Sequence, residues 1–135
     1  MNANARILKW SLLAGSLYFF CVACTHMIGA KLPILFVYFD VPSYAYQDRI
    51  ISFLAFGWAV FLFTAGRDPL VQPALVKAIL AAGAAAVCGL SIINLTTDFH
   101  ALDPQIDARI FWLETAGLSL YWLWLVAFHF RSARK

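Results

Sequence analysis

Charged residues and recognisable catalytic motifs are both scarce in this chain of 135 residues. Lys, Arg, Asp and Glu together make up 13% of it. A small soluble domain needs more polar surface than so few charged residues can provide. A soluble globular fold is therefore not expected. The chain contains no activated-serine elbow, phosphate loop, dinucleotide fingerprint or metalloprotease helix. An enzymatic role is therefore the less expected one.

Long apolar segments dominate what is present. The chain is 63% hydrophobic with a mean hydropathy of +0.78, and the sequence predicts helices over residues 7–30, 44–65, 69–95 and 104–131. Each can form about 20 helical residues, enough to cross about 30 Å of hydrocarbon. We therefore predict a single domain, residues 1–135, that is an all-α membrane protein built as a four-helix transmembrane bundle.

The charges are distributed unequally between the two ends of this predicted bundle. Six of the seven carboxylates fall on the side away from the termini. Seven of the ten basic residues fall on the side of the termini: Arg6, Lys9, Arg67, Lys77, Arg131, Arg134 and Lys135. Because basic residues stay in the cytoplasm, both termini are predicted to be cytoplasmic, in a bacterial inner membrane. A basic rim of this kind suits membrane lipids as partners and gives no reason to expect nucleic-acid binding.

Turn-forming residues mark the expected helix ends. Ser43 is expected to cap the second helix, and Asp68-Pro69 and Asp103-Pro104 each resemble an N-cap followed by a first helical residue. The loop between the first two helices is unusually apolar over residues 33–39. It is expected either to lie among the lipid headgroups or to cover the mouth of the bundle.

The third predicted helix is rich in small residues at helical spacing. Small side chains let helix backbones approach closely in lipid, where packing drives association. The sequence thus predicts either that this helix is the packed centre of the bundle or that it is the contact of a homo-oligomer. The residues concerned form two rows: Ala78, Ala82 and Ala86, and Ala81, Ala85 and Gly89.

Glu114 is the clearest candidate for a functional residue because it lies inside the fourth apolar segment. An ionisable side chain within a membrane is expensive and points to function unless it is paired. Matching of depths along the helices predicts a polar layer near the outer surface, with Glu114 in reach of His26 or an arginine. The side chains expected to join Glu114 in this layer are His26, Asp48, Arg49 and Asn94, and Tyr121 is a further binding or proton-handling candidate on the same helix face as Glu114.

Two rows of polar residues repeat every seven positions. Tyr121 lies seven residues after Glu114 with Gly117 between them, and Ser11, Tyr18 and Thr25 follow the same spacing in the first helix. Residues seven apart share one helix face, so the two rows are expected to face each other. They form either a hydrogen-bonded clasp between helices or an outward-facing pocket.

No cofactor is predicted, although a bound lipid is compatible with the composition. The residues that would ligate a metal are His26, His100 and Glu114, but no two lie three or four positions apart on a helix, so no metal site is predicted. Cys21 and Cys24 lie in an apolar helix, where small apolar packing is the expected role.

Two functional interpretations follow. The first is a small integral membrane accessory or interaction protein that works as an oligomer or as a subunit of a larger complex. The second is a small binding or transport protein for a cation, proton or amphipathic molecule, using a pocket around Glu114 and His26.

Overall fold

The fold consists of helices throughout the part of the chain that the structure describes. This computed structural model describes residues 1–30, 32, 45–102, 104 and 107–133. Four of its helices are long and apolar enough to cross a membrane, as predicted. The helices are α1 (Ala3–Ile28), α2 (Ala45–Arg67), α3 (Pro73–Thr96), the short α4 (Phe99–Leu102) and α5 (Arg109–Ala133).

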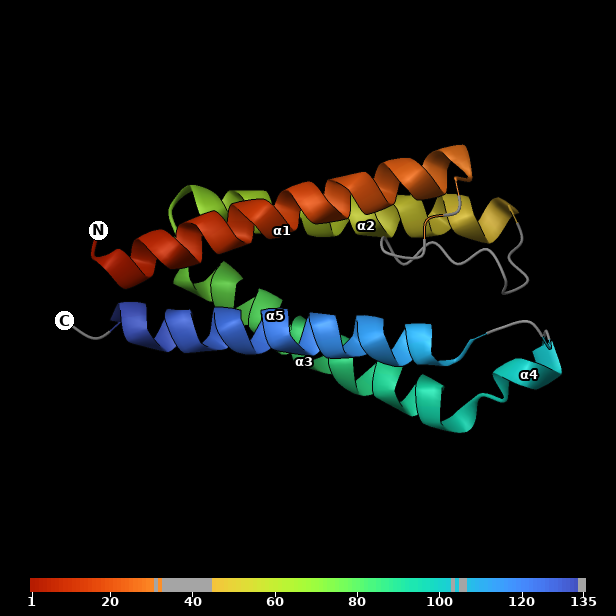
Figure 1. Cartoon of the computed structure of the whole chain (residues 1–135). Coiled ribbons are helices and arrows are strands. Elements are labelled where there is room, and N and C mark those ends of the chain that lie inside the picture. The colour runs from red at the N-terminus through yellow and green to blue at the C-terminus, as the bar shows by residue number, and fades with distance from the viewer. Residues whose placement is uncertain (31, 33–44, 103, 105–106, 134–135) are drawn as a thin grey trace.

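The four long helices form two layers, α1 with α2 and α3 with α5, as Figure 1 shows. Both termini lie at the same end of the bundle, which we call the proximal end. The Asn2 side-chain amide donates to the Ser132 carbonyl at 3.3 Å, and that of Asn4 donates to the Arg131 carbonyl at 3.5 Å. At the opposite, distal end, α1 finishes and α2 begins.

The main hydrophobic core lies in the proximal half of the bundle, where all four long helices meet. It includes Leu8 and Leu12 from α1, Leu62 from α2, Val76 from α3 and Leu125 from α5, all at most 2% exposed. The two layers are therefore held together near the termini, and the space between α1 and α5 widens toward the distal end (Figure 1).

The closest helix pair is α1 with α2, because small residues of α2 allow close approach. Ala55, Ala59 and Gly66 are buried against α1. The Ser16 hydroxyl of α1 donates to the Ala59 carbonyl at 2.7 Å, which ties the two backbones together directly. At Gly66 an added Cβ would lie only 3.0 Å from the Leu13 side chain, which would have to shift by a few tenths of an ångström to accommodate it.

Each long helix contacts two others, but α1 has nine buried residues against three in α3, so α1 and not the third long helix is the packed centre of the described bundle. The buried residues of α3 are Val76, Ile79 and Leu80, near its start. Its two rows of small residues turn away from the other helices instead. Ala78, Ala81, Ala82 and Ala85 are exposed, and Ala86 and Gly89 are half-buried. Their alternative role, as a contact between copies of the chain, stays a prediction.

Two helix starts differ from the sequence-based expectation. Asp68 does not cap α3; its carboxylate accepts from the backbone N–H of Leu70 at 3.2 Å within a turn, and the helix begins four residues after Pro69, at Pro73. The last long helix begins at Arg109, whose N–H donates to the Asp107 carboxylate at 3.0 Å. The Asp68-Pro69 pair therefore forms a turn and not a helix start. An aspartate carboxylate can accept a hydrogen bond from a backbone N–H two residues later in either structure.

Three expectations concern parts of the chain outside the described residues. These are the cap at Ser43, the cap at Asp103 and the arrangement of the apolar stretch at residues 33–39.

Candidate functional site

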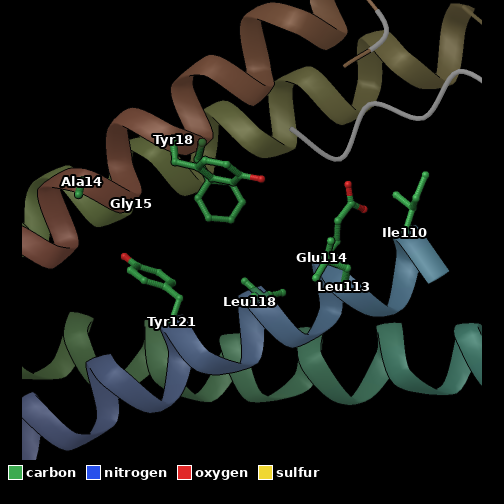
Figure 2. A pocket seen from close by; sticks show the side chains of 10 residues that line it. Ala14, Gly15, Tyr18, Ile110, Leu113, Glu114, Leu118 and Tyr121 are labelled. Carbon is green, nitrogen blue, oxygen red and sulfur yellow. The ribbon is translucent and has the colours of Figure 1, made fainter. Parts of the chain in front are cut away.

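A pocket of about 560 Å³ lies between α1 and α5 in the distal half of the bundle. Its volume is within the range of about 300–1,000 Å³ that is usual for small-molecule sites. Figure 2 shows most of the side chains around it. The lining residues are Ala14, Gly15, Tyr18 and Phe19 from α1, and Ile110, Leu113, Glu114, Gly117, Leu118 and Tyr121 from α5.

Tyr121 closes the proximal end of the pocket. Its hydroxyl donates to the Ser11 carbonyl of α1 at 3.0 Å, and Trp124, on the next turn of α5, donates to the Ser11 hydroxyl at 2.9 Å. The Tyr121 ring can lie this close to α1 because Gly15 has no side chain; an added Cβ there would overlap the Tyr121 hydroxyl.

An aromatic row supports the α1 wall of the pocket. The Tyr18 and Phe19 rings meet edge to face with their centroids 5.7 Å apart, and Phe19 stacks on Trp58 of α2 at 5.9 Å. Such pairs add to the free energy gained from burial alone. The row therefore links the pocket wall to the closely packed α1–α2 layer.

Glu114 provides the charge of the pocket. It lies five residues into α5, or about 7.5 Å along the helix at 1.5 Å per residue. Both of its carboxylate oxygens are shielded from solvent. In Figure 2 the Glu114 side chain extends from α5 toward the α1 side of the pocket, and the Tyr18 hydroxyl points toward the end of the pocket where Glu114 lies. Among the described lining residues, the polar groups toward the distal end are thus an acid and a phenol, next to apolar side chains.

The other residues of the predicted polar layer occupy different helix contacts. His26 and Asp48 are both buried, and their Nδ1 and Oδ1 atoms lie 3.4 Å apart, which joins α1 to α2. Asn94 joins α3 to α5, because its side-chain amide donates to the Thr115 hydroxyl at 2.9 Å and to the Phe111 carbonyl at 3.3 Å.

These contacts join the α1–α2 and α3–α5 pairs, and Glu114 lines the pocket between α1 and α5. That Glu114 lies in one polar layer with His26 or an arginine stays a prediction. Arg49 is exposed and lies outside the pocket lining.

The two rows of seven-residue spacing do face each other along α1 and α5. Ser11 binds Tyr121, and Tyr18 lines the same pocket as Glu114. Thr25 is the exception, since its hydroxyl donates to carbonyls of its own helix, including that of Val22 at 2.8 Å.

Sequence reasoning missed the roles of two glycines that line the pocket: Gly15 makes room for the Tyr121 hydroxyl, and Gly117 leaves open space beside it. Gly15 was not singled out, and Gly117 was noted only for its position between Glu114 and Tyr121. A glycine inside a helix costs about 1 kcal/mol relative to alanine, so it commonly has a packing or functional reason. That signal is present in the sequence at both positions.

The remaining candidates lie apart from the pocket. Cys21, Cys24 and Cys88 are free thiols. His100 is exposed on α4. Among the described residues, no group of three His, Cys, Asp or Glu side chains is arranged to hold a metal ion.

Comparisons with protein-family models, with curated proteins and with solved structures found no match to this chain. The pocket itself has the character of a small-molecule site, because it is concave and largely apolar with a few convergent polar groups. Such an arrangement suits binding of a molecule that has both an apolar part and a polar end.

Proposed function

We propose that this chain is a small integral membrane protein that binds an amphipathic molecule between α1 and α5, in a binding or transport role. The observation that carries the proposal is the Glu114 carboxylate, which lies in an apolar pocket within a membrane-spanning helix. Ionisable residues in such positions are expensive to keep and commonly mark sites of binding or transport.

The pocket favours an amphipathic ligand over a free inorganic ion. Most of its described lining residues are aliphatic or aromatic, and the polar side chains among them are Glu114, Tyr18 and Tyr121. Tyr121 already donates its hydroxyl to Ser11. An ion would gain one charged partner and lose most of its hydration, whereas an amphiphile also gains by contact of its apolar part.

The accessible edge of the pocket consists of residues on the flanks of membrane-spanning helices. Ala14 of α1 and Leu113 and Gly117 of α5 are exposed and line the pocket. Of these three residues, Leu113 has the largest side chain, and it is 75% exposed. A molecule dissolved in the bilayer would therefore reach the pocket sideways, between α1 and α5.

We also propose that both termini are cytoplasmic, so that the pocket belongs to the outer half of a bacterial inner membrane. This orientation is supported by the basic residues at the proximal end of the described chain, because positive charge stays on the cytoplasmic side. They are Arg6, Lys9, Arg67, Lys77 and Arg131.

A second candidate function is that of an accessory protein that assembles through α3. The exposed alanines of this helix favour it, since small residues permit close helix contact in lipid. The two functions are compatible, but they use opposite faces of the α3–α5 layer and respond to different substitutions.

Gly117→Leu tests the proposed function. A Cβ at Gly117 meets nothing within 4 Å, so the substitution should leave the fold intact while the new side chain fills the pocket. Gly57→Leu in α2 is the matched control, since a Cβ at Gly57 also meets open space, away from the pocket.

Binding of radiolabelled dodecylamine, dodecanol and dodecanoate would be measured in nanodiscs, with subtraction of uptake by empty nanodiscs. We expect saturable binding of at least one of them to the unsubstituted protein and to Gly57→Leu, and its loss in Gly117→Leu. No saturable binding of any of the three, or equal binding by both variants, would refute the proposed function.

A further inference from the structure

We propose that the proximal end of the bundle binds the headgroups of anionic phospholipids. The binding surface consists of basic residues from all four long helices, which we call the proximal basic rim: Arg6, Lys9, Arg67, Lys77 and Arg131. It lies at the end of the bundle away from the pocket, so the proposal goes beyond the proposed function and does not depend on it. It follows from the placement, the ion-pair contacts and the depth of these side chains.

The outermost part of the rim lies where α1 begins and α5 ends. The Asn4 side-chain amide of α1 donates to the Arg131 carbonyl of α5 at 3.5 Å, and Arg6 follows two residues later in α1. Both arginine side chains are exposed. Figure 1 shows these two helix ends projecting beyond the turn that joins α2 to α3. Each of the two projecting helix ends therefore carries an exposed arginine.

The remaining basic residues lie further in, beside the proximal core. Leu8 and Val76, which precede Lys9 and Lys77, belong to the same core cluster, so both lysines border that core. The residue before Arg67 packs against side chains of α1 that follow Lys9. Arg67 and Lys77 are exposed, and Lys9 is half-buried. These three residues form the inner part of the rim.

The positive charge of the rim is not neutralised within the described chain. None of the five basic side chains forms an ion pair with a described acid. The acid that the described chain places at this end is Asp68, whose carboxylate accepts from the backbone N–H groups of Leu70 and Val71. The Arg131 guanidinium lies 5.6 Å from the centroid of the Phe128 ring, a contact that leaves its charge in place. The rim can therefore attract an anion.

The depth of the rim matches that of lipid headgroups. At 1.5 Å per residue, Lys9 is about 9 Å into α1 and Lys77 about 6 Å into α3. Headgroups occupy about 5–7 Å on each side of the hydrocarbon, and long basic side chains extend toward them. Trp10, exposed next to Lys9, is of a residue type enriched at this boundary. A soluble polyanion would meet the helix ends, whereas these lysines lie on helix flanks that border lipid.

The distal end has a different balance of charge. Among the described residues, its Lys and Arg side chains are those of Arg49 and Arg109, and Asp98 and Asp107 are exposed acids at the same end. The Arg109 Nε atom lies 3.9 Å from an Asp107 carboxylate oxygen. Attraction of anionic headgroups is therefore expected at the proximal end and not at the distal one.

Spin-labelled lipids test this proposal. The protein is reconstituted in vesicles of dioleoylphosphatidylcholine that contain a trace of phosphatidylglycerol or phosphatidylcholine, labelled at the same position of the acyl chain. Electron paramagnetic resonance then measures how strongly each lipid associates with the protein surface. Because both leaflets have the same composition, the result does not depend on which way the protein is inserted.

Two double variants separate the two ends of the bundle. Arg6→Gln/Lys77→Gln removes two exposed charges from the rim. Arg49→Gln/Arg109→Gln is the matched control, because it removes two exposed charges from the distal end. We expect the unsubstituted protein and the control to associate with phosphatidylglycerol at least about twofold more strongly than with phosphatidylcholine.

In the rim variant this preference should fall by at least about half, whereas Arg6→Lys/Lys77→Arg, which keeps both charges, should retain it. Salt at about 1 M, where the Debye length is about 3 Å, should also weaken it. Equal association of the two lipids with the unsubstituted protein overturns the proposal, as does an equal loss of preference in the rim variant and in the distal control.

Inorganic phosphate distinguishes a lipid headgroup from a soluble anion as the ligand. Sodium phosphate added at constant ionic strength should leave the association of phosphatidylglycerol unchanged, because the rim lies along the flanks of membrane-spanning helices. Displacement of the lipid by free phosphate would show that the rim binds soluble anions instead, and the proposal would be wrong.

Discussion

Gly15→Ala should destabilise the bundle, because the Tyr121 side chain of α5 packs directly against α1 at Gly15. An added Cβ would overlap the Tyr121 hydroxyl and lie 2.9 Å from its Cζ atom, closer than real Cβ contacts. The Tyr121 ring would have to move away from α1. Its hydrogen bond to the Ser11 carbonyl, now 3.0 Å, would then be lost.

The magnitude follows from three contributions. Loss of a hydrogen bond between membrane helices costs about 0.6 kcal/mol on average and up to about 1.7. Overpacking of a close contact adds about 1–3 kcal/mol. Replacement of a helical glycine by alanine offsets up to about 1 kcal/mol of this. We therefore expect a net loss of about 1–3 kcal/mol in the free energy of unfolding, with the overpacking dominant.

Equilibrium unfolding by sodium dodecyl sulfate in mixed micelles, followed by circular dichroism, would measure this loss. Gly117→Ala is the control, since a Cβ there meets nothing within 4 Å and the variant should be at least as stable as the unsubstituted protein. In a Tyr121→Phe background the cost of Gly15→Ala should shrink but not vanish, because the ring carbon remains close. A Gly15→Ala protein of unchanged stability, or a cost that Tyr121→Phe leaves unaltered, would refute the reasoning.

Four further outcomes are expected. Asn94→Leu should lower the free energy of unfolding by about 0.6–1.7 kcal/mol, because it removes both hydrogen bonds from this side chain to α5. Thr96→Ala is the control, since the Thr96 hydroxyl donates only within α3. A loss in Asn94→Leu no larger than the loss in Thr96→Ala would contradict the prediction. Asp48→Ala should cost about 1–3 kcal/mol in the same assay, since it deprives buried His26 of a partner at 3.4 Å, and an unaltered unfolding curve would count against it. Ala82→Leu should change the free energy of unfolding of the single chain by no more than about 0.5 kcal/mol, because Ala82 is exposed. If α3 is the contact between copies of the chain, the same variant should form smaller oligomers in light scattering. An unchanged oligomer size would exclude this helix as the contact. If both termini are cytoplasmic, a cysteine placed at either terminus should react with an impermeant maleimide only after cells are permeabilised. The native cysteines are first replaced, so that only the new one can react. Labelling in intact cells would show the opposite orientation.

The number of transmembrane helices and their approximate bounds were predictable from the sequence. The helix predicted over residues 7–30 is observed as Ala3–Ile28, and the one predicted over 44–65 is observed as Ala45–Arg67. The reason is that the length of an apolar run determines whether a helix can cross a bilayer. An even number of crossings then brings both termini to one end, as the contacts of Asn2 and Asn4 bear out.

Helix starts were less predictable. The third helix was expected from residue 69 and begins at Pro73, and the fourth was expected from residue 104 and begins at Arg109. The short helix α4 was not expected at all. Aspartate followed by proline stabilises a turn as readily as a helix start, so local sequence cannot choose between them.

The faces of single helices were also predictable, but their partners were not. Seven-residue spacing placed Glu114 and Tyr121 on one face of α5, and both do line the pocket. Matching of depths suggested His26 as a neighbour of Glu114, which stays a prediction, but it did not single out Asp48 of α2, whose Oδ1 lies 3.4 Å from Nδ1 of His26. Helical periodicity relates residues within one helix, and it leaves open which other helix that face meets.

Only the tertiary structure decided that choice. Ala55, Ala59 and Gly66 of α2 let it pack tightly on α1, while Ala78, Ala81, Ala82 and Ala85 of α3 are exposed. The pocket exists because α1 is held to α2 along its length and joined to α5 chiefly in the proximal half, by contacts such as Tyr121 with Ser11. Close packing between helices depends on the shapes of both partners at once, and this information is not contained in the periodicity of either sequence segment alone.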